Sequence, residues 1–184
     1  MQIKRKSKFS FIPDKWLITA VGDVFIFLNT VSLSRKQLIN DNLNKSSIFN
    51  IHYGDIHSKF QSELLDLSKH NILPRIINET SFKSKKDYLR DGDIVMADAS
   101  EDYEGLCDCV ELKNVKDFKI ISGLHTFSLR DKDGYFINGF KPYLFKHPEV
   151  VKSIHKIATG ISVLGVSKAN LKKLNLIFPP RKEQ

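Results

Sequence analysis

Short apolar runs recur along the whole chain, and each is bounded by glycine, proline or charged residues. Runs of about four to eight such residues between turn signals are typical of strands. The pattern predicts strands or extended segments at 24–28, 49–53, 73–77, 94–97, 106–112, 119–122, 125–129 and 174–178. The runs at 94–97 and 106–112 flank the acidic stretch 100–105 and predict a hairpin across it.

Helical periodicity is clear only near the C-terminal end. Val150, Ile154 and Ile157 recur at the spacing of one helix face. Pro148 suits the first helical position, and Gly160 suits the end. We therefore expect a helix between these two residues.

Two serines predict shorter helices, because a serine hydroxyl accepts hydrogen bonds from a first helical turn. Ser34 precedes 35–38, and Ser167 precedes 168–173. We expect turns at Gly22-Asp23 and Gly54-Asp55, and a loop or short helix at 61–67. Scattered strands mixed with short helices indicate an α/β (mixed α+β) fold rather than a doubly wound sheet.

The composition adds a class of partner to this outline. A length of 184 residues suggests one domain over 1–184, and 41% hydrophobic residues can form a core. The net charge of +8 favours a polyanion such as nucleic acid, although it is also what a merely lysine-rich chain would show. No apolar run approaches the roughly 20 residues of a membrane span, and the N-terminus lacks a signal-peptide core. We expect a cytoplasmic protein with no membrane partner.

The residues that commonly bind metals are too scattered to predict a metal site. Cys107 and Cys109 would lie on the same side of one strand, but no second cysteine pair accompanies them. The six histidines form no His-x-x-x-His pattern. We expect the cysteines to be buried as small apolar residues and no metal to be bound.

One set of residues could be catalytic. Asp98, Glu111 and Lys113 resemble the acid and Glu-x-Lys arrangement of metal-dependent nucleases, in which carboxylates hold a cation near the scissile phosphate. The pattern is common by chance, so the nuclease is an alternative hypothesis and an ordinary charged strand is the other interpretation. The sequence contains neither a glycine-rich phosphate loop nor an adenine-methyltransferase Asn/Asp-Pro-Pro-Tyr/Phe motif, so we expect no cofactor and no methyl transfer.

Several segments resemble, in their order and spacing, one target recognition domain of the specificity subunit of type I restriction–modification systems. The segments are Trp16 with Val21-Gly-Asp23, Ser34–Leu38, Ile51–His57, Leu89 with Gly92–Val95, Ile121–Arg130, and Ala158 to Gln184 with its Pro179-Pro180 and Glu183-Gln184. The resemblance covers nearly the whole chain. Each segment alone is a weak signal, and their combination is fairly specific.

The resemblance implies a non-catalytic module with a twisted, mostly antiparallel sheet and short helices. Such a module reads one half of a bipartite DNA target, while partner modification subunits methylate adenine and a restriction subunit cleaves. The resemblance also implies a coiled-coil spacer helix, of which only 181–184 could be present here. A half-subunit, a truncated product and an excised piece all fit this pattern, and a second specificity half-subunit is a further expected partner.

We expect double-stranded DNA to be contacted by basic clusters and by loop residues near these segments, because lysines position a protein on phosphates and polar side chains read bases. For His125 and Thr126, packing within a strand is the alternative. The candidate set is His57, Ser58, Lys59, Lys83, Lys85, Lys86, Ser122, His125, Thr126, Arg130, Lys152, Lys156 and Lys168.

Overall fold

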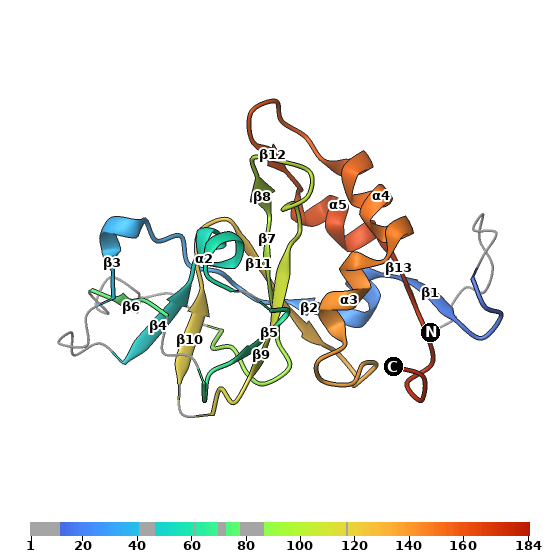
Figure 1. The fold of residues 1–184 in the computed structure, drawn as a ribbon, viewed down its shortest axis with the longest axis horizontal. Helices are drawn as coiled ribbons and strands as arrows, with labels where there is room; N and C mark the ends of the chain where they lie inside the picture. The colour runs from blue at the N-terminus through green and yellow to red at the C-terminus, as the bar shows by residue number, and fades with distance from the viewer. Residues whose placement is uncertain (1–11, 41–46, 61, 70–72, 78–86, 117) are drawn as a thin grey trace.

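The computed structural model describes residues 12–40, 47–60, 62–69, 73–77, 87–116 and 118–184 (Figure 1). A five-stranded sheet crosses the middle of the molecule in the order β2-β11-β7-β9-β5. Its strands are β2 (Phe25–Phe27), β5 (Leu64–Asp66), β7 (Ile94–Ala97), β9 (Cys109–Lys113) and β11 (Thr126–Asp131). All pairs are antiparallel except β5 with β9.

A second sheet lies on the other side of β11 from the helices of the C-terminal half, at the left of Figure 1. Its order is β10-β4-β6-β3, with β4 and β10 parallel. Its strands are β3 (Leu38–Ile39), β4 (Ile48–Ile51), β6 (Arg75–Ile76) and β10 (Lys119–Ser122). Two ribbons complete the sheets: β1 (Leu17–Ala20) pairs with β13 (Asn175–Phe178), and β8 (Ala99–Ser100) pairs with β12 (Leu164–Gly165).

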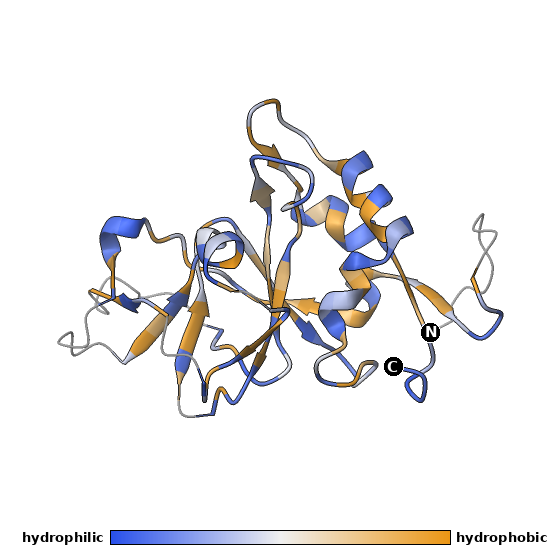
Figure 2. Cartoon of the chain, viewed as in Figure 1, coloured by the Kyte–Doolittle hydropathy of each residue, from blue (hydrophilic) through white to orange (hydrophobic). Residues whose placement is uncertain are grey.

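The helices are short. They are α1 (Val21–Val24), the 3-10 turn η1 (Arg35–Gln37), α2 (Tyr53–Ser58), α3 (Lys141–Lys146), α4 (Pro148–Ile157) and α5 (Lys168–Lys173). In Figure 2, α3, α4 and α5 each include both hydrophobic and hydrophilic residues, as expected for helices that cover a core on one face only.

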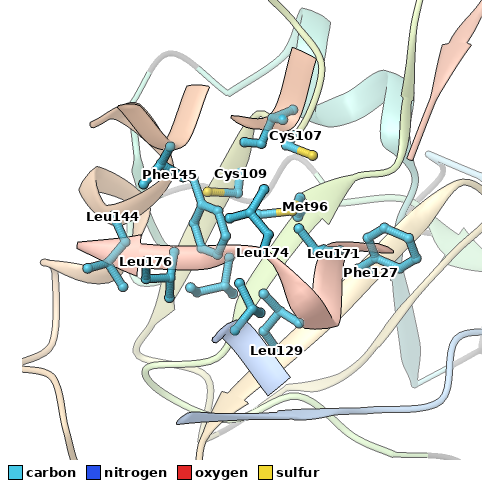
Figure 3. Close-up of a cluster of buried hydrophobic side chains, with 14 of the residues drawn as sticks. Met96, Cys107, Cys109, Phe127, Leu129, Leu144, Phe145, Leu171, Leu174 and Leu176 are labelled. Carbon is cyan, nitrogen blue, oxygen red and sulfur yellow. The ribbon is translucent and has the colours of Figure 1, made fainter. Parts of the chain in front are cut away.

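The main core lies between the central sheet and the helices α3, α4 and α5 (Figure 3). Met96 and Leu129 are contributed by the sheet, and Leu144 and Leu171 by the helices. A second cluster, which includes Val95 and Ile120, fills the opposite face of the central sheet. The central sheet is therefore buried on both faces, which explains the continuous apolar run of β7, Ile94–Ala97.

The mixed fold class predicted from the sequence is confirmed, as are the hairpin between β7 and β9, helix α4 and the helices after Ser34 and Ser167. Three local predictions are wrong. Gly22-Asp23 lies within helix α1, residues 53–58 form helix α2 instead of a strand end and turn, and 61–67 contains strand β5. Helix α4 also ends at Ile157, before the expected stop at Gly160.

Candidate nucleic-acid interface

The segment Ile51–His57 is organised around a buried carboxylate. His52 caps α2 by accepting a hydrogen bond at Nδ1 from the Gly54 amide (3.2 Å), and burial lowers the pKa of His52, which favours the neutral ring that can accept. Asp55 is fully buried, and its Oδ2 accepts from the His52 amide at 3.0 Å. Its Oδ1 lies 2.9 Å from both Arg35 Nη1 and Lys59 Nζ. Lys59, a predicted DNA contact, is thus held inside the protein's own ion pair.

A second ion pair joins two other segments that suggested the resemblance. Asp93 is almost fully buried and accepts two hydrogen bonds from Arg130, from Nε to Oδ1 at 2.8 Å and from Nη2 to Oδ2 at 2.6 Å. Arg130 also donates to the Tyr88 carbonyl, and the hydrogen bond with Asp93 raises the pKa of Arg130. The guanidinium proposed to contact DNA therefore holds β7 to β11.

The closing segment also has an internal role. Arg181 donates through Nη1 to the carbonyls of Gly134 and Phe136. The Gln184 side chain accepts from the Ile137 amide at 3.0 Å and donates to the Tyr135 carbonyl at 3.3 Å. These contacts fasten residues 181–184 to the loop 134–137.

Three predicted DNA contacts do meet in space. His57 and Ser58 of α2 and His125, before β11, line one cleft of about 690 Å³. The Tyr53 ring lies between the two histidine rings, with centroid distances of 6.1 Å to His57 and 5.4 Å to His125. Ser58 Oγ donates to the Gly54 carbonyl at 2.5 Å, so its hydroxyl hydrogen is already used.

Both histidines interact with residues at the junction of β7 and β8. His57 Nε2 lies 3.2 Å from the Ala99 carbonyl oxygen, and His125 Nδ1 lies 3.2 Å from Asp98 Oδ1. His125 has a φ of 53°, a left-handed backbone conformation that places its ring over the cleft beside Tyr53. Burial raises the pKa of Asp98, although the His125 ring opposes that change.

The opposite wall of this cleft is acidic. Glu101, Asp102, Glu104 and Asp108 line it, and no lysine or arginine of the described chain does. The hydrogen bond from the Gly105 amide lowers the pKa of Asp102, whereas burial raises the pKa of Asp108. The sequence predicted a hairpin across 100–105, and it did not reveal that these residues face α2.

Two other residues of the predicted contact set, Ser122 and Thr126, are buried. Ser122 is fully buried, and its hydroxyl has no hydrogen-bond partner among the described residues. Thr126 is also buried and donates to the Gly123 carbonyl at 2.7 Å. As packed here, neither side chain reaches the surface, because both lie in strands that are covered on both sides.

The remaining predicted contacts are lysines. Lys152, Lys156 and Lys168 are exposed on α4 and α5, and Lys152 pairs with Glu149 at 2.7 Å. Lys168 and Lys172 place their Nζ atoms 5.4 and 5.2 Å from the centre of the Phe27 ring. Lys83, Lys85 and Lys86 lie outside the described residues.

The residues of the nuclease alternative are not assembled into a site. Glu111 is fully buried and accepts hydrogen bonds from Lys141 Nζ at 2.7 Å and from the Gly139 amide at 2.8 Å. Glu111 stands opposite Ile94, whereas Asp98 is four residues further along, about 13 Å at the rise of a strand. Lys113 pairs with Asp66 instead.

The cysteines are buried and free, as expected, although Cys107 lies in a turn with a φ of 66° and only Cys109 lies in β9. Burial raises the pKa of the Cys107 thiol to about 12. Within the described residues, no three histidine, cysteine or acidic side chains are placed to hold a metal ion. The helices of that same part of the chain include none with the length and apolar character of a membrane span.

Comparison with solved structures relates this fold to known proteins. The type I restriction–modification S subunit from M. genitalium matches over 96% of this chain with a TM-score of 0.51 and 13% identity. The HsdS subunit from Thermoanaerobacter tengcongensis matches over 96% with a TM-score of 0.56 and 15% identity. A structure from work on assembly of the type I system matches over 97% with a TM-score of 0.58 and 15% identity.

These matches span almost the whole chain but only 36 to 37% of each matched structure. No protein-family model and no curated protein matches the chain. The chain therefore has the fold of a target recognition domain of a type I specificity subunit, and the resemblance predicted from the sequence is confirmed at the level of the fold.

Proposed function

We propose that this chain is a sequence-specific DNA-binding module that reads one half of a bipartite target. The observation that carries the proposal is the fold, which is shared with type I specificity subunits over nearly all of the chain. The net charge of +8 supports a polyanionic partner. In this proposal the module carries no catalytic site. It directs adenine methylation by modification subunits and cleavage by a restriction subunit, with a second specificity half-subunit as a further partner.

For phosphate contact we propose the exposed lysines of α4 and α5, namely Lys152, Lys156 and Lys168. The ion pair of Lys152 with Glu149 does not argue against this role, because exposed pairs contribute little and exchange readily for phosphate. Phosphate contacts fix the position of a protein on DNA and carry no base specificity. In this proposal, loop side chains read the bases.

Fluorescence anisotropy of a labelled duplex between about 50 and 200 mM salt tests the proposal. We expect affinity to fall steeply with salt. The triple variant Lys152→Ala, Lys156→Ala, Lys168→Ala should reduce the slope by about one unit for each of these lysines that binds a phosphate. The control variant Lys15→Ala, Lys36→Ala, Lys116→Ala removes the same charge from exposed lysines elsewhere. An equal effect of both variants would show that only net charge matters.

Binding that does not change with salt would contradict the proposal altogether. The link to methylation is tested separately by sequencing the methylome of the host with and without the gene. Loss of one bipartite methylated motif is the expected result, and an unchanged methylome would contradict it.

A further inference from the structure

The cleft between α2 and residues 99–105 differs in charge from the rest of the protein. Glu101, Asp102, Glu104 and Asp108 form one wall in a chain whose net charge is +8. DNA phosphates are repelled by such a wall, whereas a cation is attracted to it. The cleft is therefore poorly suited to the DNA backbone, and a positively charged group matches its acidic wall better.

Three of the four carboxylates are available to a ligand. Asp102 is used in its own turn, where it accepts from the Gly105 amide at 2.7 Å and lies 3.3 Å from Ser100 Oγ. The carboxylates of Glu101, Glu104 and Asp108 accept no hydrogen bond from the residues that the structure describes. Asp108 is only partly exposed, so its unpaired carboxylate has lost part of its hydration. A donor group that entered the cleft would replace that hydration.

The facing wall is aromatic. The rings of Tyr53, His57 and His125 are arranged edge to face around Tyr53, at interplanar angles of 79° and 84°. A planar guanidinium combines both kinds of contact, because it donates several hydrogen bonds to carboxylates and stacks on aromatic faces. An ammonium group makes the charge contact but not the planar one.

The rim of the cleft is apolar and exposed. Val163 lines the cleft and is 56% exposed, and Ile161, two residues earlier in the same loop, is 100% exposed. Apolar side chains held in water beside a charged cleft are typical of a protein-binding surface. They offer little to a free small cation or to a phosphate backbone.

We propose that this cleft binds the guanidinium group of an arginine that a protein partner presents, with apolar residues of the partner covering Val163 and Ile161. The proposal goes beyond DNA recognition and does not depend on it. It gives the chain a second face, through which a partner subunit would dock while the lysines of α4 and α5 remain free for phosphates.

Titration of the ¹⁵N-labelled protein with an acetylated Leu-Gly-Arg-Gly-Leu amide peptide tests the proposal by NMR. We expect the amide signals of Gly54, Ala99 and Gly105 to shift. The same peptide with citrulline in place of arginine keeps the shape and removes the charge, and we expect its binding to be about tenfold weaker, as when a charge-assisted hydrogen bond is removed. Equal binding of the two peptides would overturn the proposal.

Two protein variants complete the experiment. Glu101→Gln, Glu104→Gln, Asp108→Asn should abolish peptide binding, whereas Asp14→Asn, Asp133→Asn, Glu183→Gln changes the net charge equally at exposed sites elsewhere and should leave it intact. Val163→Ser should weaken binding of the peptide but not of free arginine. If free arginine binds as tightly as the peptide, a protein partner is contradicted.

A competition with duplex DNA separates this proposal from DNA recognition. The peptide and a duplex should bind together, with the duplex leaving the Gly54 and Gly105 signals of the peptide complex unchanged. Displacement of the peptide by DNA would assign the cleft to the DNA interface and overturn the proposal. If the peptide binds but no duplex does, the DNA-binding function fails and this inference stands.

Discussion

Arg35 and Asp55 form an ion pair, with Arg35 Nη1 2.9 Å from Asp55 Oδ1, that connects η1 to the first turn of α2. The two residues are 20 positions apart, and Asp55 is fully buried while the Arg35 side chain is 47% exposed. The pair fixes where α2 begins and therefore where Tyr53 and His57 face the cleft.

Substitution of the two partners should have unequal effects, because only one of them is buried. Asp55→Ala leaves the buried His52 amide without its acceptor, and we expect a loss of about 2–4 kcal/mol in the free energy of unfolding. Arg35→Ala leaves Lys59 in place, and we expect a loss of about 1 kcal/mol or less. Urea denaturation of both variants measures the difference, and equal losses would contradict this account.

Gly123 permits the close approach of β10's end to β4. A Cβ atom at this position would lie 2.5 Å from Asn50 Oδ1 and 3.0 Å from the Ile51 carbonyl oxygen. We expect Gly123→Ala to destabilise the fold by about 1–3 kcal/mol through overpacking. Gly165→Ala is the matched control, because a Cβ there meets no atom closer than 3.7 Å. Thermal unfolding of the two variants should separate them, and similar melting temperatures would refute the steric argument.

The buried pair of Lys141 and Glu111 should be costly to break from one side. Lys141→Met leaves a fully buried carboxylate without its cation, and we expect a loss of about 3–5 kcal/mol. Lys141→Met combined with Glu111→Gln removes both charges and keeps an acceptor for the Gly139 amide, so it should recover much of this loss. Urea denaturation of the single and double variants tests the coupling. A double variant no more stable than the single one would contradict it.

Asp66 should contribute to the acid sensitivity of the fold. Hydrogen bonds from Ser68 and Asn114 lower the pKa of Asp66 from 3.8 to about 2. A carboxylate whose pKa is lower in the folded state stabilises that state above its unfolded pKa, and this contribution is lost as the pH falls from about 4 to about 2.

The Asp66→Asn variant should therefore lose less stability than the native chain over that pH range. The measurement is the urea midpoint between pH 2 and pH 5, with Asp14→Asn as the control for one removed charge at an exposed position. Parallel curves for the native chain and Asp66→Asn would exclude this carboxylate as a source of the pH dependence.

Much of the fold could be predicted because it depends on local patterns. The apolar runs at 94–97 and 174–178 became β7 and β13, and the periodicity after Pro148 became α4. The elements that were missed depend on distant partners. Helix α2 contains a glycine, and Asp55 in its first turn, which completes the cap, is held by an ion pair with the distant Arg35. Strand β5 forms by pairing in parallel with β9.

The candidate site was predictable only in part for the same reason. The sequence singled out His57 and His125, and the structure places both beside Tyr53. It could not show that residues 101–108 form the facing wall, because that position depends on the pairing of β8 with β12, more than 60 residues apart. The sequence also could not show that Arg130 is paired with Asp93 and is not free to contact DNA.

The ribbon of β1 and β13 has a mechanical consequence. Leu17, at the start of β1, stands opposite Phe178, at the end of β13, and the pairing continues inward to Ala20 and Asn175. A force that pulls the two ends of the chain apart therefore acts first on the pair of Leu17 and Phe178. The ribbon then opens one residue pair at a time, and its hydrogen bonds do not all bear the load together. Once the contacts of Arg181 and Gln184 with the loop 134–137 are broken, we expect the ribbon to open before the central sheet does, so that the cleft at α2 keeps its shape.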